Sequence, residues 1–114
     1  MDSDSTVGEL REIGAKFVGD RDWEKYHRPK DLAMALSIEA AELLELFLWE
    51  QDKGGAIEGD LAEKAKDELA DVMIYCLSFA NAQGWDLSDA VKAKVRKNEN
   101  KYPADKYRGV ARLG

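Results

Sequence analysis

The sequence predicts an all-α protein, and three observations support this fold class. Apolar residues recur every three to four positions over most of the chain, which is the period of a helix buried on one side. No stretch of useful length alternates apolar and polar residues as a half-buried strand does. Both prolines and a group of glycines fall between the periodic segments, where such residues end helices. We therefore expect one domain, residues 1–114, built as a four-helix bundle.

The first expected helix runs from about Thr6 to Gly19, because Leu10, Ile13 and Phe17 form an apolar stripe at helical spacing. A connecting stretch, 20–30, follows. It contains two aromatic residues and the single histidine of the chain: Trp23, Tyr26 and His27.

The two long helices are expected at about 31–51 and 60–83. Asp31 and Asp60 are residue types that cap helix N-termini. Gly84 fits the left-handed position that commonly follows a helix C-terminus.

A shorter fourth helix is expected from about Ser88 towards Asn100, because Pro103 cannot continue a helix. The tail, about 103–114, is expected to be irregular.

Composition excludes several classes of protein. The chain has 17 basic and 23 acidic residues, a net charge of −6, which argues against a nucleic-acid-coating protein. No apolar run is long enough to span a membrane. A polar, acidic N-terminus and a single cysteine favour a cytoplasmic protein without disulfides.

Two pairs of carboxylates fall on apolar helix faces. At about 100° per residue, Glu39 lies in the middle of a face made of leucines and alanines, and Glu42 lies beside it. Glu68 occupies the same kind of position on the third helix, with Asp71 beside it. Each long helix therefore presents one carboxylate pair from an apolar surface.

Carboxylates in such surroundings need a physical explanation, because burial raises their energy or makes them take up a proton. A bound cation is one explanation; an exposed polar groove, or ordinary solvent-facing helix charges, are the alternatives. One histidine and one cysteine are too few for an imidazole or thiolate site, and the Glu-x-x-His pairs of a di-iron bundle are missing. An all-oxygen site favours Mg²⁺, with Mn²⁺ or Ca²⁺ as substitutes.

The opposite sides of both long helices are also apolar, and a chain this short has little protein with which to cover them. We therefore expect self-association, with twofold symmetry as the default. The residues concerned are Leu44, Leu48, Leu69, Met73, Leu77 and Ala80.

Aromatic and basic residues suggest where a ligand of the metal would lie. On a helical projection Trp49 falls on the same side of Glu39 as Glu42 does. Tryptophans on helices usually fill cores, but Trp23 and Trp49 are also candidates for stacking on a base. In the last expected helix Lys94, Asn98 and Lys101 recur at helical spacing, and Tyr102 is adjacent to this row of donors. This row is either a phosphate clamp or a solvated basic helix end.

Taken together, several ordered segments of the sequence resemble the MazG-like nucleotide pyrophosphohydrolases, and within them the dCTP pyrophosphatase branch. The resemblance covers nearly the whole chain from about residue 9. The segments that carry it are Arg21–Pro29, Leu32–Ala33, Glu39–Trp49, Glu68–Val72, Lys94, Asn98 and Tyr102–Pro103.

The resemblance implies an all-α fold of the nucleoside triphosphate pyrophosphatase type that assembles as a dimer or a dimer of dimers, a homotetramer, with sites completed across subunits. It implies that Glu39, Glu42, Glu68 and Asp71 bind Mg²⁺, and that Glu45 holds or activates water. Trp23, His27 and Trp49 would belong to the base pocket, and Lys94, Asn98 and Tyr102 to the phosphate end.

The expected reaction is Mg²⁺-dependent hydrolysis of a nucleoside triphosphate, with dCTP or a modified dCTP as the expected substrate, to a monophosphate and pyrophosphate. Asp31, Ile38 and Ala41 depart from the dCTP-type pattern, and these departures concern the base that is bound rather than the reaction. Two alternatives stand beside it: a non-enzymatic helical oligomerisation or regulatory module, and a phosphoribosyl-ATP-type pyrophosphohydrolase.

Overall fold

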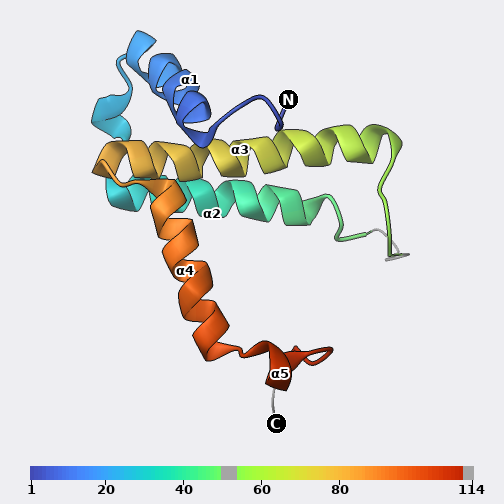
Figure 1. The fold of residues 1–114 in the computed structure, drawn as a ribbon. Coiled ribbons are helices and arrows are strands. Elements are labelled where there is room, and N and C mark those ends of the chain that lie inside the picture. Colours follow the sequence, from blue (N-terminus) through green and yellow to red (C-terminus); the bar gives the residue numbers. More distant parts are fainter. Residues whose placement is uncertain (50–53, 112–114) are drawn as a thin grey trace. The chain divides into compact units, whose positions relative to one another are not determined.

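The computed structural model describes residues 1–49 and 54–111, and the secondary structure within them is helical, with no strand (Figure 1). This confirms the all-α class. No helix in these ranges is long and apolar enough to cross a membrane. The chain divides into two compact units, 1–84 and 85–114. Each unit is described by itself, and the single domain remains a prediction.

The first helix, α1 (Val7–Asp20), begins where the sequence predicted. Thr6 is its N-cap, and the Thr6 hydroxyl accepts a hydrogen bond from the backbone N–H of Glu9 at 3.1 Å. This bond satisfies one of the donors that a helix N-terminus leaves unpaired. A short 3-10 helix, η1 (Glu24–Tyr26), then leads towards the second helix.

The second helix, α2, spans Pro29–Glu45 and begins earlier than predicted. Arg28 is its N-cap, so the prediction that Asp31 caps the helix is wrong. The reason is Pro29, whose fixed φ and missing N–H suit the first helical position. Asp31 lies in the first turn instead, where a negative charge is favourable.

The end of α2 also differs from the prediction. The helix stops at Glu45, and the next residues continue as turns in which the Leu46 N–H bonds to the Leu43 carbonyl at 3.3 Å and the Leu48 N–H to the Glu45 carbonyl at 3.3 Å. These hydrogen bonds join residues three positions apart instead of four, which is common where a helix ends. The predicted end at Gln51 lies outside the described residues.

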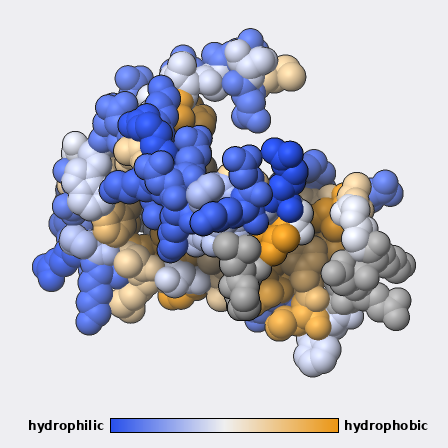
Figure 2. Space-filling view, turned by 60° about the horizontal axis from the view of Figure 1, so that its bottom comes forward, coloured by the Kyte–Doolittle hydropathy of each residue, from blue (hydrophilic) through white to orange (hydrophobic). Residues whose placement is uncertain are grey.

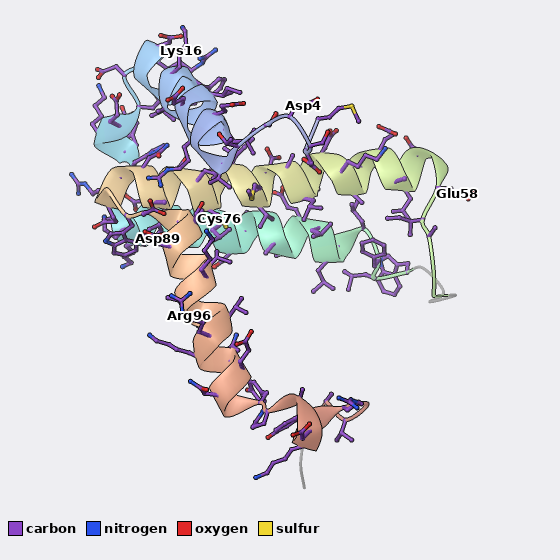
Figure 3. The ribbon with its side chains drawn as sticks, viewed as in Figure 1. Asp4, Lys16, Glu58, Cys76, Asp89 and Arg96 are labelled. Carbon is purple, nitrogen blue, oxygen red and sulfur yellow. The ribbon has the colours of Figure 1, made fainter. Side chains whose placement is uncertain are left out.

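The longest helix, α3 (Gly59–Gln83), begins after Glu58, which is its N-cap (Figure 3). The prediction that Asp60 caps this helix is therefore wrong. The Asp60 carboxylate instead forms an ion pair with Lys64, one turn further along the helix, at 3.1 Å. Gly84 ends α3 in the left-handed conformation, φ 69°, as predicted.

Within the first unit, α3 is the central element: α2 runs antiparallel along one side of it and α1 packs on another (Figure 1). Two of the residues expected on an open apolar face, Leu77 and Ala80, are buried inside the unit. Among the described residues the buried hydrophobic side chains are Leu32, Ala65, Leu77 and Ala80.

Much apolar surface is left open. Leu44, Leu48, Leu69 and Met73 are exposed, as the sequence predicted for a face that a second subunit would cover, and Figure 2 shows hydrophobic patches among the hydrophilic surface. The self-association itself remains a prediction.

Two hydrogen bonds join α1 to α3. Arg11 Nε donates to Asn81 Oδ1 at 2.8 Å, and Asn81 Nδ2 donates back to the Arg11 carbonyl at 3.1 Å. Both bonds are partly buried, so they fix how α1 lies along α3.

The second unit contains α4 (Leu87–Lys101) and α5 (Ala104–Tyr107). Asp86 caps α4 by accepting from the Asp89 N–H at 2.9 Å, so the helix begins before the predicted Ser88.

The prediction of an irregular tail is wrong over the four residues of α5. The Pro103 carbonyl accepts from the Lys106 N–H at 3.0 Å and from the Tyr107 N–H at 3.1 Å. The Tyr107 ring packs edge-on against Tyr102, with 5.2 Å between ring centroids. Pro103 thus ends one helix and, through its carbonyl, starts another turn.

Candidate metal centre

Three of the predicted carboxylates come together between α2 and α3. Glu39 and Glu42 on α2 and Glu68 on α3 each offer an oxygen, and these oxygens all lie within 4.8 Å of one another. The local reason is the three-residue spacing on α2, which puts two carboxylates side by side on the surface that faces α3. Their apolar neighbour Leu32 is buried, which confirms that this face is the inner one.

Asp71, the fourth predicted ligand, lies on α3 three residues after Glu68 and is half-buried. It is not one of the three whose oxygens share the 4.8 Å limit. Its negative charge nevertheless acts on the cluster, because it contributes to the raised pKa of both Glu39 and Glu68. The structure thus places all four carboxylates in one neighbourhood, with Asp71 further out.

The cluster is electrostatically unfavourable as it stands. The pKa of Glu39 is raised to about 7, most of all by burial and then by the neighbouring carboxylates of Glu42, Glu68 and Asp71. Burial is also the largest cause of the raised pKa of Glu68. Like charges held close together in a partly desolvated place favour the protonated acid.

Two carboxylate oxygens of the cluster have no partner. Glu39 Oε2 and Glu68 Oε2 are both buried and make no hydrogen bond. Buried polar atoms are usually satisfied, and oxygens that are crowded, unsatisfied and negatively charged have the properties of cation ligands. The donor set is all oxygen, which fits a hard divalent ion such as Mg²⁺.

Two predicted residues near the end of α2 do not join the cluster. Glu45 is the last residue of α2 and is exposed. Trp49 is 95% exposed and lies in the turn after the helix. The helical projection that put Trp49 beside the cluster is therefore wrong, because α2 ends four residues earlier.

Trp23 lies at the other end of the first unit, between α1 and η1. Its ring packs edge-on against Phe17 at 5.9 Å, and the Arg21 guanidinium lies 3.7 Å from the centre of the Phe17 ring. Trp23 is still 44% exposed. It is held by local contacts and keeps accessible ring surface.

His27 lines a cavity of about 370 Å³ between α1, η1 and the C-terminal half of α3. His27 was predicted as a site residue from the sequence, whereas the other polar residues of this cavity were not. Glu24 belongs to the Arg21–Pro29 segment and could have been singled out. The two polar residues that α3 contributes are Ser78 and Asn81. They could not be predicted, because a single sequence does not show that this part of α3 meets α1.

The predicted phosphate-binding residues belong to the second unit. Lys94 and Asn98 lie four residues apart on α4, and Tyr102 follows as its C-cap, its N–H bonded to the Asn98 carbonyl at 2.7 Å. The helical spacing puts the side chains of Lys94 and Asn98 in one row. Their part in a site with the carboxylates remains a prediction.

Comparison with known proteins gives consistent results. A family model described as the MazG-like family matches residues 34–112. dCTP pyrophosphatase 1 of Bos taurus is 38% identical over 112 residues, 96% of this chain and 66% of the relative. The Homo sapiens protein of the same name is 38% identical over 110 residues, 94% and 65%. The chain thus spans slightly less than two thirds of the length of these relatives.

Among solved structures, a pyrophosphatase from Archaeoglobus fulgidus DSM 4304 is similar, with a TM-score of 0.70 and 40% sequence identity. The match covers 84% of this chain and 91% of that one.

Proposed function

We infer, because this chain belongs to the MazG-like family, that it is a nucleotide pyrophosphohydrolase that depends on Mg²⁺. The reaction is hydrolysis of a (deoxy)nucleoside triphosphate to a monophosphate and pyrophosphate. dCTP or a modified dCTP is the proposed substrate, since the relatives are named dCTP pyrophosphatases. The proposed role is removal of unwanted nucleotides in the cytoplasm.

The observation that carries this proposal is the carboxylate cluster between α2 and α3. Its three carboxylate oxygens lie within 4.8 Å of one another, and two buried oxygens have no hydrogen-bond partner. Such an arrangement destabilises a protein interior but is suited to binding a cation. Glu39, Glu42 and Glu68, with Asp71, would hold the metal. Mn²⁺ is expected to replace Mg²⁺, because it accepts the same oxygen ligands. A bound Mg²⁺ supplies charge neutralisation of the phosphates and a more acidic water.

The remaining residues would orient the substrate. His27 offers a polar group and Trp23 an aromatic ring to the base. Trp49 lies outside the carboxylate cluster and would reach the substrate only if the segment after α2 moved towards it. Lys94, Asn98 and Tyr102 carry donors suited to phosphoryl oxygens. Glu45, exposed at the end of α2, is proposed to accept the proton of the attacking water. A homodimer or homotetramer would complete the site from several chains.

The test is pyrophosphate release from a panel of dNTPs and NTPs with Mg²⁺. Glu39→Gln and Glu68→Gln keep the size of the side chain and remove its charge. Both are expected to lower kcat/KM by more than the roughly 10- to 100-fold loss that supporting residues of metal sites cause. Glu63→Gln is the matched control, because Glu63 lies on the same helix with an exposed side chain and should leave turnover unchanged.

Equal activity of the two variants and the control would refute the site. If the unaltered protein releases no pyrophosphate from any nucleotide and its melting temperature does not respond to Mg²⁺, the chain is a non-enzymatic helical module.

A further inference from the structure

Trp23 lies in a turn whose backbone is fixed by hydrogen bonds to the end of α1. Arg21 is the C-cap of this helix, and Asp22 follows in the left-handed conformation, φ 54°. The Asp22 N–H bonds to the Gly19 carbonyl at 3.1 Å. The Trp23 N–H bonds to the Val18 carbonyl, also at 3.1 Å. These two bonds form the Schellman motif, which fixes the backbone of Trp23 but leaves the direction of its ring to side-chain contacts.

Two side chains at the end of α1 hold this ring. The Trp23 ring packs edge-on against Phe17, with 5.9 Å between ring centroids and 75° between the planes. The central carbon of the Arg21 guanidinium lies 3.7 Å from the centre of the Phe17 ring and 6.0 Å from that of Trp23. Arg21 Nη1 also donates to the Phe17 carbonyl at 3.0 Å. The three side chains therefore form one continuous stack.

The place of the guanidinium goes beyond what the end of a helix requires. A cation near a helix C-terminus is favourable and can bond to the last carbonyls, and lysine does this as arginine does. Stacking on the face of an aromatic ring, in contrast, is a property of the planar guanidinium. Phe17 is 50% exposed and Trp23 44%, and exposed side chains change rotamer readily. Contacts within the stack therefore decide how the two rings are oriented.

We propose that Arg21 is a positioning residue for the nucleobase. It holds the Phe17 ring, and through Phe17 it fixes the direction in which Trp23 presents its own ring to the base. A ring that is already held loses less freedom when a base stacks on it, so the base binds more tightly. The inference rests on the proposed function, in which Trp23 stacks on the base, and it adds two residues that act through Trp23.

The experiment measures the hydrolysis of dCTP by Arg21→Lys. Lysine keeps the charge and the bond to the helix end, so the melting temperature should hardly change. KM should rise by about three- to tenfold, which corresponds to the loss of one cation–π contact. The value of kcat should stay the same, because a contact to the base acts equally on substrate and transition state. Phe17→Leu should raise KM in the same way.

Lys25→Met is the matched control. Lys25 Nζ lies 5.5 Å from the centre of the Tyr26 ring and 3.2 Å from the Asp22 carboxylate. The variant thus removes a cation from another ring of the same segment and leaves the stack intact, so KM should not change. An unchanged KM in Arg21→Lys overturns the inference. An equal rise in both variants also overturns it, because the loss of any nearby cation would then explain the effect.

Near-ultraviolet circular dichroism reports on the ring without any ligand, since it depends on fixed side-chain packing. The signal of Trp23 is the difference between each protein and its Trp23→Phe counterpart. This signal should weaken in Arg21→Lys and stay unchanged in Lys25→Met. If Arg21 only caps the helix, lysine restores the signal in full, and the inference is wrong.

Binding separates this inference from the proposed function. Titration of the metal-free protein with dCMP, followed by the fluorescence of Trp23, needs no hydrolysis. If the unaltered protein releases no pyrophosphate from any nucleotide but dCMP quenches Trp23, and Arg21→Lys needs about three- to tenfold more dCMP, the function fails and the inference holds. If the unaltered protein hydrolyses dCTP and Arg21→Lys has the same KM, only the inference fails. If it neither hydrolyses nucleotides nor binds dCMP, both fail.

Discussion

The polar groups on the two sides of α3 differ in whether they have hydrogen-bond partners. Towards α1, Arg11 and Asn81 exchange two hydrogen bonds, so the oxygen and the nitrogen of the Asn81 amide both have a partner. Towards α2, Glu39 and Glu68 meet carboxylates and keep one buried oxygen each without a partner. A satisfied polar pair stabilises a fold, whereas an unsatisfied acidic cluster weakens it unless a ligand is bound. The difference separates a structural contact from a site.

The largest expected effect concerns metal binding at the unsatisfied side. A titration of the unaltered protein with Mg²⁺ should raise its melting temperature, because a ligand that binds the folded state stabilises it. Glu68→Gln should weaken the apparent affinity for Mg²⁺ by more than about 100-fold. In the metal-free protein the same change should raise the melting temperature by removing one repelling charge. Destabilisation of the metal-free protein would contradict this account.

The pH dependence of the metal-free protein should have an unusual sign. The pKa of Glu39 rises from 4.5 to about 7 on folding, so the folded chain binds this proton more tightly than the unfolded chain. The stabilisation is fully present below pH 4.5 and is lost as the pH rises through about 7. The melting temperature should therefore fall between about pH 4.5 and pH 7 and level off at higher pH.

Glu39→Gln removes the titrating group and should flatten that slope, while Glu63→Gln should keep it. With saturating Mg²⁺ the slope should reverse, since the ion competes with the proton for the same oxygens. Identical profiles for Glu39→Gln and the unaltered protein would assign the pH response to other groups.

A smaller effect is expected on the satisfied side. Asn81→Ala removes both bonds to α1 and leaves the partly buried Arg11 without its acceptor, which should lower the free energy of unfolding by about 1–3 kcal/mol. Urea denaturation measures this. Asn100→Ala, at an exposed position of α4, should change it by less than about 0.5 kcal/mol. If the two variants were equal, the Arg11–Asn81 pair would contribute nothing to the packing of α1.

The smallest effect is expected at the solvent-facing side of α1. Lys16 bonds to Asp20 at 2.7 Å, but both side chains are more than half exposed (Figure 3). Lys16→Ala should change the free energy of unfolding by at most about 0.5 kcal/mol in urea melts. A larger loss would mean that charge pairs matter here even without burial.

The fold was predictable where local chemistry decides it. α1 begins close to Thr6 and Gly84 ends α3, both as expected, because each residue acts on its own backbone neighbourhood. Asp31 and Asp60 are equally good caps by residue type, yet the chain enters the helices at Pro29 and Gly59. Residue type alone does not decide between competing starts a few positions apart.

The candidate site was predictable as far as helical geometry holds. Glu39, Glu42 and Glu68 converge because each lies inside a regular helix whose apolar face is clear from the sequence. Trp49 was misplaced because the projection was carried beyond the end of α2. The contact between Arg11 and Asn81, residues 70 positions apart, depends on tertiary packing, and a single sequence contains no signal for it.

The small core of the first unit links folding to the amount of protein present. Few apolar side chains of the described part are buried, while Leu44, Leu69 and Met73 face solvent. If copies of the chain cover these faces, part of the free energy that holds each copy folded comes from its neighbours. Dilution alone would then lower the melting temperature, and folding and assembly would be a single equilibrium.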